Sequence, residues 1–300
     1  MKFMKYMDVT EASRLWGITD RRIRYLCNEG RIDGAIKTGW SWTIPSDAPK
    51  PRDGRTLRHY KNLDIRPGGI DVEKLSGLKK ALPLSDETKT LPFYRGLITE
   101  TFLFLMDREG MKLRKKDIDS IYDGKLVPSL SLETHLIAIN FRSAMLSLVT
   151  NAEPWTDKDI RVLYKSLMQG IDDISSMKWR EGYAEHEVRG KEKLPVDVQM
   201  ETLFTQYESW KGMNSLVTGV MLFGELLRIR PFERYSALLS YLVAAGEMLR
   251  AGILPPILKR GEEMDFDAAF LVASSRGNYR DFTQFMEMHV HSSYREAGNV

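Results

Sequence analysis

The chain has 300 residues, of which 43% are hydrophobic and 28% charged, a balance typical of a globular protein. No apolar run reaches the roughly 18 to 20 residues of a membrane span, and the first residues lack the apolar core of a signal peptide. Cys27 is the only cysteine, which excludes an internal disulfide. We therefore expect a cytoplasmic protein with no membrane partner.

The charge is unevenly distributed along the chain. Residues 1–68 contain 14 Lys/Arg and 8 Asp/Glu, a net charge of +6, and the whole chain carries only +3, which leaves −3 for the remainder. A basic head on a slightly acidic body predicts that only the head meets nucleic acid. The five histidines form no zinc-type cluster, so no metal site is expected.

Composition divides the chain into three regions. Residues 1–48 form the expected head, residues 49–69 are rich in Pro, Gly and Arg and are typical of a basic linker, and residues 70–300 have helical periodicity. The predicted fold class is mainly α, with a small β-hairpin in the head and another in the body.

The head begins with two short helix patterns. Val9–Trp16 is the first, a turn ending in Thr19 follows, and residues 20–29 form the second, Arg-rich helix. A helix, a tight glycine turn and a basic helix are the order of a helix-turn-helix, whose second helix enters the major groove of DNA. The candidate DNA-binding residues in the second helix and its cap are Thr19, Arg21, Arg22, Arg24 and Tyr25.

Residues 31–45 alternate around Gly39 as a β-hairpin would. The whole head resembles the winged helix-turn-helix of the MerR/excisionase group, with matching runs at residues 8–12, 16–18, 30–35 and 42–45. The resemblance places Lys37 and Trp40 at the wing tip, near the minor groove or backbone, and implies DNA as a partner. One such module makes few phosphate contacts, so a homodimer reading two half-sites is expected. A basic protein-interaction module remains the alternative.

Several helices are predicted in the body. They cover residues 93–108, 131–149, 214–228 and 233–251, and two more begin at a Thr156/Asp159 capping box and at Pro195. The pair at 214–228 and 233–251 is the most apolar and should be central. Residues 183–188, flanked by glycines, predict a small hairpin, or flap.

The segment 222–232 resembles the approach to the Fic motif, in which Ile229, Pro231 and Phe232 match. Residues 178–180 and 187–195 resemble the Fic flap and the segment before it, and residues 266–285 resemble the closing helices. These segments follow the family's order, and the resemblance covers about residues 93–289. It implies an all-helical Fic domain with a short flap, in which a nucleotide and Mg²⁺ serve AMP transfer to a protein hydroxyl.

The motif departs from the family at every chemical position. Arg230 replaces the histidine base and cannot accept a proton, and Arg234 replaces the acidic metal ligand and would repel Mg²⁺. Other residues replace the Gly-Asn-Gly phosphate loop and the two clamp arginines. The eroded motif comprises Arg230, Pro231, Phe232, Glu233, Arg234, Tyr235, Ser236, Ala237, Leu238 and Tyr241. No catalytic residue is intact, and a pseudoenzyme is expected.

Ser129 and Glu133 resemble the family's inhibitory helix. The family partner of this glutamate is the second clamp arginine, so Glu133 is expected to lack its usual partner.

The candidate anion-binding residues are Arg230, Arg234 and Ser236, near a helix expected to begin about Glu233. They predict a site for a phosphate-bearing ligand such as ATP without turnover. The alternative, which we favour, has no cofactor and pairs both arginines with Glu225 and Glu233.

Three functions follow from these patterns. The first is a DNA-binding regulator whose Fic-like body serves dimerisation or ligand sensing. The others are an active Fic transferase and an antitoxin-like scaffold.

Overall fold

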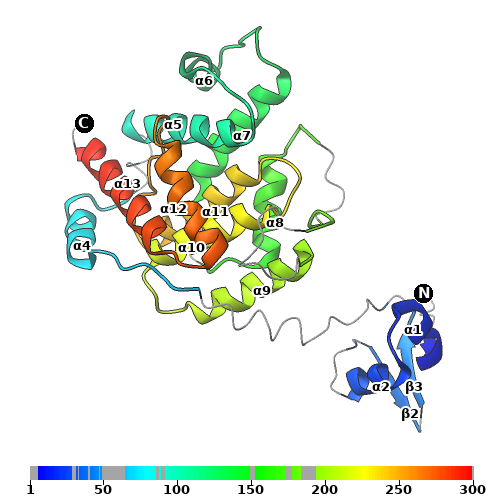
Figure 1. The fold of residues 1–300 in the computed structure, drawn as a ribbon. Helices are drawn as coiled ribbons and strands as arrows, with labels where there is room; N and C mark the ends of the chain where they lie inside the picture. The colour runs from blue at the N-terminus through cyan, green and yellow to red at the C-terminus, as the bar shows by residue number, and fades with distance from the viewer. Residues whose placement is uncertain are drawn as a thin grey trace. The chain divides into compact units, whose positions relative to one another are not determined.

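A computed structural model shows that the chain packs into two compact units, residues 1–59 and 60–300, which are described separately (Figure 1). The structure describes residues 6–28, 32, 34–39, 41–46, 48, 65–85, 88, 92–148, 153–172, 178–183 and 194–298.

The head combines two helices with a three-stranded antiparallel sheet. Its elements are β1 (Tyr6–Asp8), α1 (Val9–Trp16), α2 (Asp20–Asn28), β2 (Ile36–Thr38) and β3 (Ser41–Pro45). The strand order is β1-β3-β2, with Met7 opposite Ile44 and Lys37 opposite Trp42. The hairpin of β2 and β3 was expected, whereas β1 was not.

Local chemistry fixes both helices of the head. Asp8 and Glu11 form a capping box at the start of α1, and Gly17 ends it in the left-handed conformation at φ 63°. The hydroxyl of Thr19 accepts a 3.4 Å hydrogen bond from the backbone N–H of Arg22, as an N-cap does. Buried side chains of α1, α2 and β3 form a small apolar core that includes Val9, Ala12, Trp16, Ile23, Leu26, Cys27 and Ile44.

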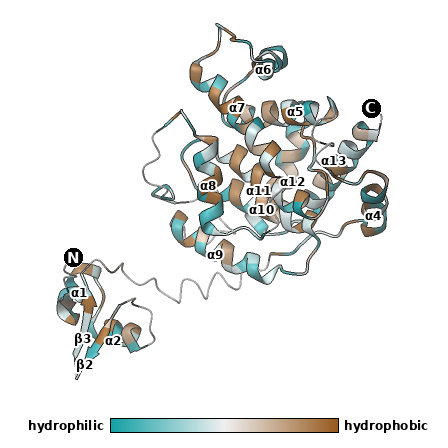
Figure 2. Ribbon diagram, turned by 180° about the vertical axis from the view of Figure 1, so that it is seen from behind, coloured by the Kyte–Doolittle hydropathy of each residue, from teal (hydrophilic) through white to brown (hydrophobic). Residues whose placement is uncertain are grey.

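The body is a helical assembly. Its helices are α4 (Val72–Ala81), α5 (Pro92–Arg108), α6 (Lys115–Tyr122), α7 (Leu132–Ser147), α8 (Asp157–Leu167), α9 (Val196–Ser209), α10 (Ser215–Ile229), α11 (Ser236–Arg250), α12 (Glu263–Arg276) and α13 (Arg280–Gly298). Every residue from Leu216 to Ile229 of α10, and all but the last of α11, is buried. The two helices pack against each other inside the body, and Figure 2 shows other helices around them.

Most predicted helices are confirmed, some with shifted ends. The Thr156/Asp159 capping box opens α8, Pro195 is the N-cap of α9, and the Asn214 side chain caps α10. The prediction that the last central helix begins about Glu233 is wrong, because α11 begins at Ser236. The Ser236 hydroxyl accepts a hydrogen bond from the N–H of Phe232 and donates one to the carbonyl of Phe232. These bonds hold the residues before α11 in a turn.

The predicted flap lies largely outside the described residues. Tyr183 forms an isolated antiparallel bridge with Pro195, and the N–H of Val196 donates to the carbonyl of Gly182 at 3.0 Å. The two ends of the intervening segment are therefore held together. In the part of the chain that the structure describes, no helix has the length and apolarity needed to cross a membrane.

A buried polar network joins three helices of the body. Arg228 of α10 donates to Glu225 at 2.6 Å and to Gln199 of α9 at 2.5 Å. The other oxygen of Glu225 accepts a 2.8 Å hydrogen bond from Tyr279, just before α13. Gly224 makes this approach possible, since a Cβ there would lie 2.6 Å from the Tyr279 ring. These groups hold α10 in register with α9 and with the start of α13.

Candidate functional site

The predicted DNA-contacting face lies on α2. Ile23, Leu26 and Cys27 are buried in the head core, and the 3.6-residue period therefore turns Arg21, Arg24 and Tyr25 outward. Tyr25 is 49% exposed. The helix thus presents cations and a phenol together to solvent.

Neighbouring side chains orient two of the α2 arginines. The guanidinium of Arg22 lies over the Tyr25 ring at 5.3 Å from its centroid. Arg24 pairs with Asp20 one turn earlier at 3.7 Å, and Asp20 also accepts from the Thr10 hydroxyl at 3.3 Å. Asp20 therefore ties the start of α2 to α1.

The wing contributes one described candidate. Lys37 is exposed in β2, and its ammonium lies 5.9 Å from the centroid of the Trp42 ring. Trp40, the other predicted wing residue, lies outside the described residues. Trp42, which the sequence did not single out for function, packs partly against the head core and presents its ring to the Lys37 ammonium.

The second candidate site is the turn between α10 and α11. Arg230 ends α10 at φ 48°, and Tyr235 precedes α11 at φ 55°. They are the only described residues other than glycine with positive φ. Such a conformation costs about 1–3 kcal/mol per residue and persists only where the surroundings enforce it. Both ends of the turn are therefore held by their neighbours.

Arg180 holds the first end. Its side chain donates to the carbonyls of Arg230 at 2.6 Å and of Ile229 at 3.2 Å, and its backbone N–H donates to Pro231 at 2.9 Å. These carbonyls stand at the C-terminus of α10, where the helix dipole favours a cation. Arg180 also donates to the carbonyl of Tyr183, where the predicted flap starts.

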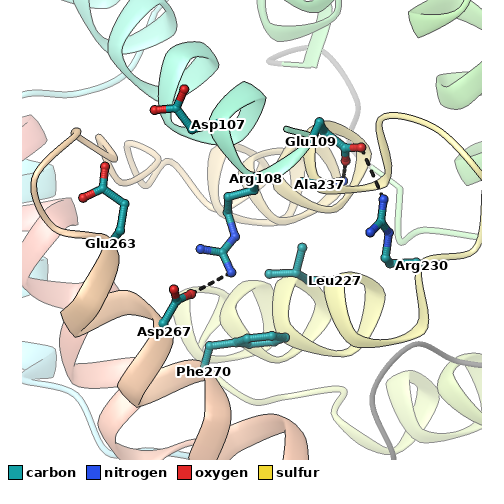
Figure 3. A pocket seen from close by; sticks show the side chains of 9 residues that line it. All are labelled: Asp107, Arg108, Glu109, Leu227, Arg230, Ala237, Glu263, Asp267 and Phe270. Carbon is teal, nitrogen blue, oxygen red and sulfur yellow. Dashed lines mark hydrogen bonds and ion pairs between the residues drawn. The ribbon is translucent and has the colours of Figure 1, made fainter. Parts of the chain in front are cut away.

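Glu109, directly after α5, holds the second end. One carboxylate oxygen accepts the Ala237 N–H at 2.8 Å, and the other accepts the Tyr235 N–H at 3.2 Å. The second oxygen also lies 3.4 Å from Arg230, and the Glu109 side chain is only 7% exposed. Figure 3 shows this carboxylate between Arg230 and Ala237. The helix start that should attract an anion already holds one from the chain itself.

Arg234 is directed away from this carboxylate. It pairs with Glu133 of α7 and with Asp172, the latter at 3.1 Å, and the Tyr235 hydroxyl also donates to Glu133. As expected, Glu133 does not pair with position 241, where Tyr241 replaces the clamp arginine; Arg234 and Tyr235 are its partners instead. Ser129 is exposed in the turn before α7, and Ser131 is the residue that caps this helix.

The expected pairing of the motif arginines with Glu225 and Glu233 is also wrong. Glu225 belongs to the buried network with Arg228, and the partners of Arg230 and Arg234 lie in distant segments. The three candidate anion-binding residues thus separate, because the Ser236 hydroxyl is used within the turn. Of the two motif arginines, only Arg230 contacts the Glu109 carboxylate at the α11 start.

The remaining motif positions serve packing. Phe232 stacks on Tyr164 with a centroid distance of 3.6 Å and an interplanar angle of 4°. Leu238 and Tyr241 are fully buried, and the Tyr241 hydroxyl donates to the carbonyl of Pro256. Burial raises the pKa of Tyr241, so this phenol stays protonated. Glu233 is exposed.

A cavity of about 360 Å³ borders the Glu109 carboxylate (Figure 3). Its lining residues are Asp107, Arg108, Glu109, Leu227, Arg230, Ala237, Glu263, Asp267 and Phe270. Arg108 pairs with Asp267 at 2.7 Å, and Leu227 and Phe270 supply an apolar floor. Among the described residues, no group of three or more His, Cys, Asp or Glu could hold a metal ion.

The nucleotide that the Fic resemblance implies does not fit the residues present here. Its phosphates would need the amides at the start of α11, which Glu109 occupies. Sequence reasoning missed Glu109 because it lies 126 and 128 residues before its two amide partners. No local pattern marks such a contact.

Solved structures of Fic proteins resemble the chain. Residues 134–508 of Fic-1 from C. elegans match with a TM-score of 0.62 and 16% identity, covering 82% of this chain and 73% of that one. A Fic domain containing signaling protein from Bacteroides thetaiotaomicron gives a TM-score of 0.61 and 15% identity, covering 76% and 96%. A Fic family protein from Desulfovibrio desulfuricans gives 0.57 and 17%, covering 78% and 76%.

No family profile and no curated protein matches the sequence. At these identities the structural likeness shows the fold alone: the chain has a Fic-like, mainly helical fold.

Proposed function

We propose that the chain is a DNA-binding regulatory protein whose Fic-like body does not transfer nucleotides. The observation that carries the proposal is the division of α2 into two faces. Ile23, Leu26 and Cys27 anchor the helix, and Arg21, Arg24 and Tyr25 face solvent. In this proposal residues 1–48 form the DNA-binding head, 49–69 the linker and 70–300 the body.

The chemistry of the α2 face suits a DNA major groove. Arginine can bond guanine O6 and N7 together, and a tyrosine hydroxyl can donate to phosphate. Lys37 in β2 supplies a further cation for the backbone. Because nonspecific binding by such a module is weak, about 10⁻⁴ to 10⁻⁶ M at physiological salt, useful specificity needs a homodimer on two half-sites.

The body lacks the chemistry of a transferase. A guanidinium at position 230 stays protonated and cannot act as a base, and Arg234 carries the wrong charge for a metal ligand. The α11 amides that would hold a phosphate are bonded to Glu109. These features favour a regulatory role over AMP transfer.

DNA binding is tested by fluorescence anisotropy with duplexes selected by the protein from a random pool. We expect Arg21→Ala and Arg24→Ala to weaken binding and each to lower the slope of log K against log salt by about 1 if it removes a phosphate contact. Arg276→Ala, at an exposed arginine of the body, is the matched control and should bind as the unmodified protein does. Equal binding by all variants would refute the proposed DNA face.

The absence of transfer is tested separately. The purified protein is incubated with labelled ATP and a cell lysate, and no protein-dependent labelling is expected. A labelled product that depends on this chain would establish the alternative, an active transferase.

A further inference from the structure

We infer that Glu109 is a built-in occupant of the α11 N-terminus that keeps external oxyanions out of this site. The inference deepens the non-catalytic part of the proposed function and is independent of DNA binding by the head. It names one carboxylate, outside the motif, as the group that closes the site.

The geometry is that of a bound oxyanion. Both oxygens of Glu109 are used, one on the Ala237 amide and one on the Tyr235 amide, and Arg230 approaches from the side. Two N–H donors at a helix start and a guanidinium are the groups that recognise phosphate in proteins. The chain therefore satisfies an oxyanion site with its own side chain.

The buried helix α5 holds Glu109 in place. Glu109 directly follows α5, a helix of 17 residues, and its backbone N–H donates to the carbonyl of Leu105 at 3.2 Å. Eleven residues of α5 are buried, so the helix cannot readily withdraw. A carboxylate fixed at the site acts at a high effective concentration, and a free anion must displace it.

Space for an external anion lies directly beside this carboxylate. The cavity of about 360 Å³ is bordered by Glu109, Arg230 and Ala237 (Figure 3). Shortening the Glu109 side chain would join this cavity to the two amides and leave Arg230 without the Glu109 contact. The inferred ligand class of the opened site is a small oxyanion such as inorganic phosphate.

The test measures inorganic phosphate binding to the full-length protein by ³¹P NMR titration. We expect Glu109→Ala to bind phosphate at least about tenfold more tightly than the unmodified chain, a difference of about 1.4 kcal/mol. Glu263→Ala removes an acidic side chain from the same cavity without touching the amides, and it should show no gain. Adding Arg230→Ala to Glu109→Ala should reverse the gain.

Thermal unfolding gives a second readout that tolerates a weakened fold. Phosphate should raise the Tm of Glu109→Ala more than that of Glu263→Ala, because a ligand of the folded state stabilises it. If Glu109→Ala does not fold, the same two measurements are made on Glu109→Gln. The glutamine side chain has one acceptor oxygen, and its NH₂ group cannot accept a hydrogen bond, so one of the two backbone amides loses its partner. Equal phosphate affinity in the unmodified chain, the Glu109 variant and Glu263→Ala would overturn the inference.

Discussion

Removal of Arg228 from the buried network should strongly destabilise the body. The Arg228 and Glu225 side chains are 4% and 8% exposed, and Arg228 donates to both Glu225 and Gln199. Arg228→Met keeps the apolar bulk but leaves the Glu225 carboxylate buried with Tyr279 as its remaining donor in this network. Breaking one partner of a buried pair costs about 3–5 kcal/mol because it strands a charge.

This cost has a measurable size in thermal unfolding. For domains of about 150–250 residues, 1 kcal/mol shifts Tm by about 2–4 °C, so Arg228→Met should lower the Tm of the body by roughly 6–20 °C. Urea denaturation followed by circular dichroism gives the free energy directly. Arg276→Met, at an exposed position, is the control and should change stability by less than about 0.5 kcal/mol.

A double-mutant cycle separates the stranded charge from lost packing. Glu225→Gln in the Arg228→Met background removes the buried charge while its side-chain carbonyl can still accept from Tyr279. The double variant should therefore be more stable than the sum of the two single losses predicts. Additive losses, or a loss below about 1 kcal/mol for Arg228→Met, would refute the reasoning.

Three further predictions concern the body. Gly224→Ala should cost about 1–3 kcal/mol in urea denaturation, because the new Cβ would lie 2.6 Å from the Tyr279 ring, and pairing it with Tyr279→Leu should recover part of the loss. Arg180→Ala should lower the free energy of unfolding by about 2–3 kcal/mol in the same assay, since the carbonyls at the end of α10 lose a charged donor. Arg180→Lys should recover only part of this stability, because an ammonium lacks the planar fork of a guanidinium. Full recovery with lysine would contradict this reasoning. Burial lowers the pKa of His289, and the negative charge of Glu262 offsets part of this effect. Below about pH 6.5 His289 is therefore protonated in the unfolded state before it is protonated in the folded state. Stability should therefore fall as pH drops from about 6.5, and His289→Gln should flatten this slope; an unchanged slope would exclude His289 as its source.

Features set by short-range chemistry could be predicted from the sequence. The capping box at Thr156, the Asn214 start of α10 and the Gly17 turn of the head each depend on residues within four positions. The continuous apolar run of the central helices likewise predicted their burial. These elements follow from caps and periodicity alone.

Features set by contacts between distant residues could not be predicted from the sequence. Leu132 and Ile139 have the spacing of a core face on α7, yet they are 70% and 45% exposed because other residues of the helix meet the core. The start of α11 is displaced to Ser236 by a turn that Arg180 and Glu109 hold from afar. At the candidate site, the sequence identified the motif residues but did not predict the partners of Arg230 and Arg234.

The short strand β1 has a consequence for the geometry of the head. Asp8 is at once the last residue of β1, paired with Thr43, and the residue that caps α1. Strand β1 and helix α1 thus share one residue, with no intervening loop to absorb a rotation between them. Because β1 also pairs with β3, we expect the sheet and α1 to move together as one rigid unit.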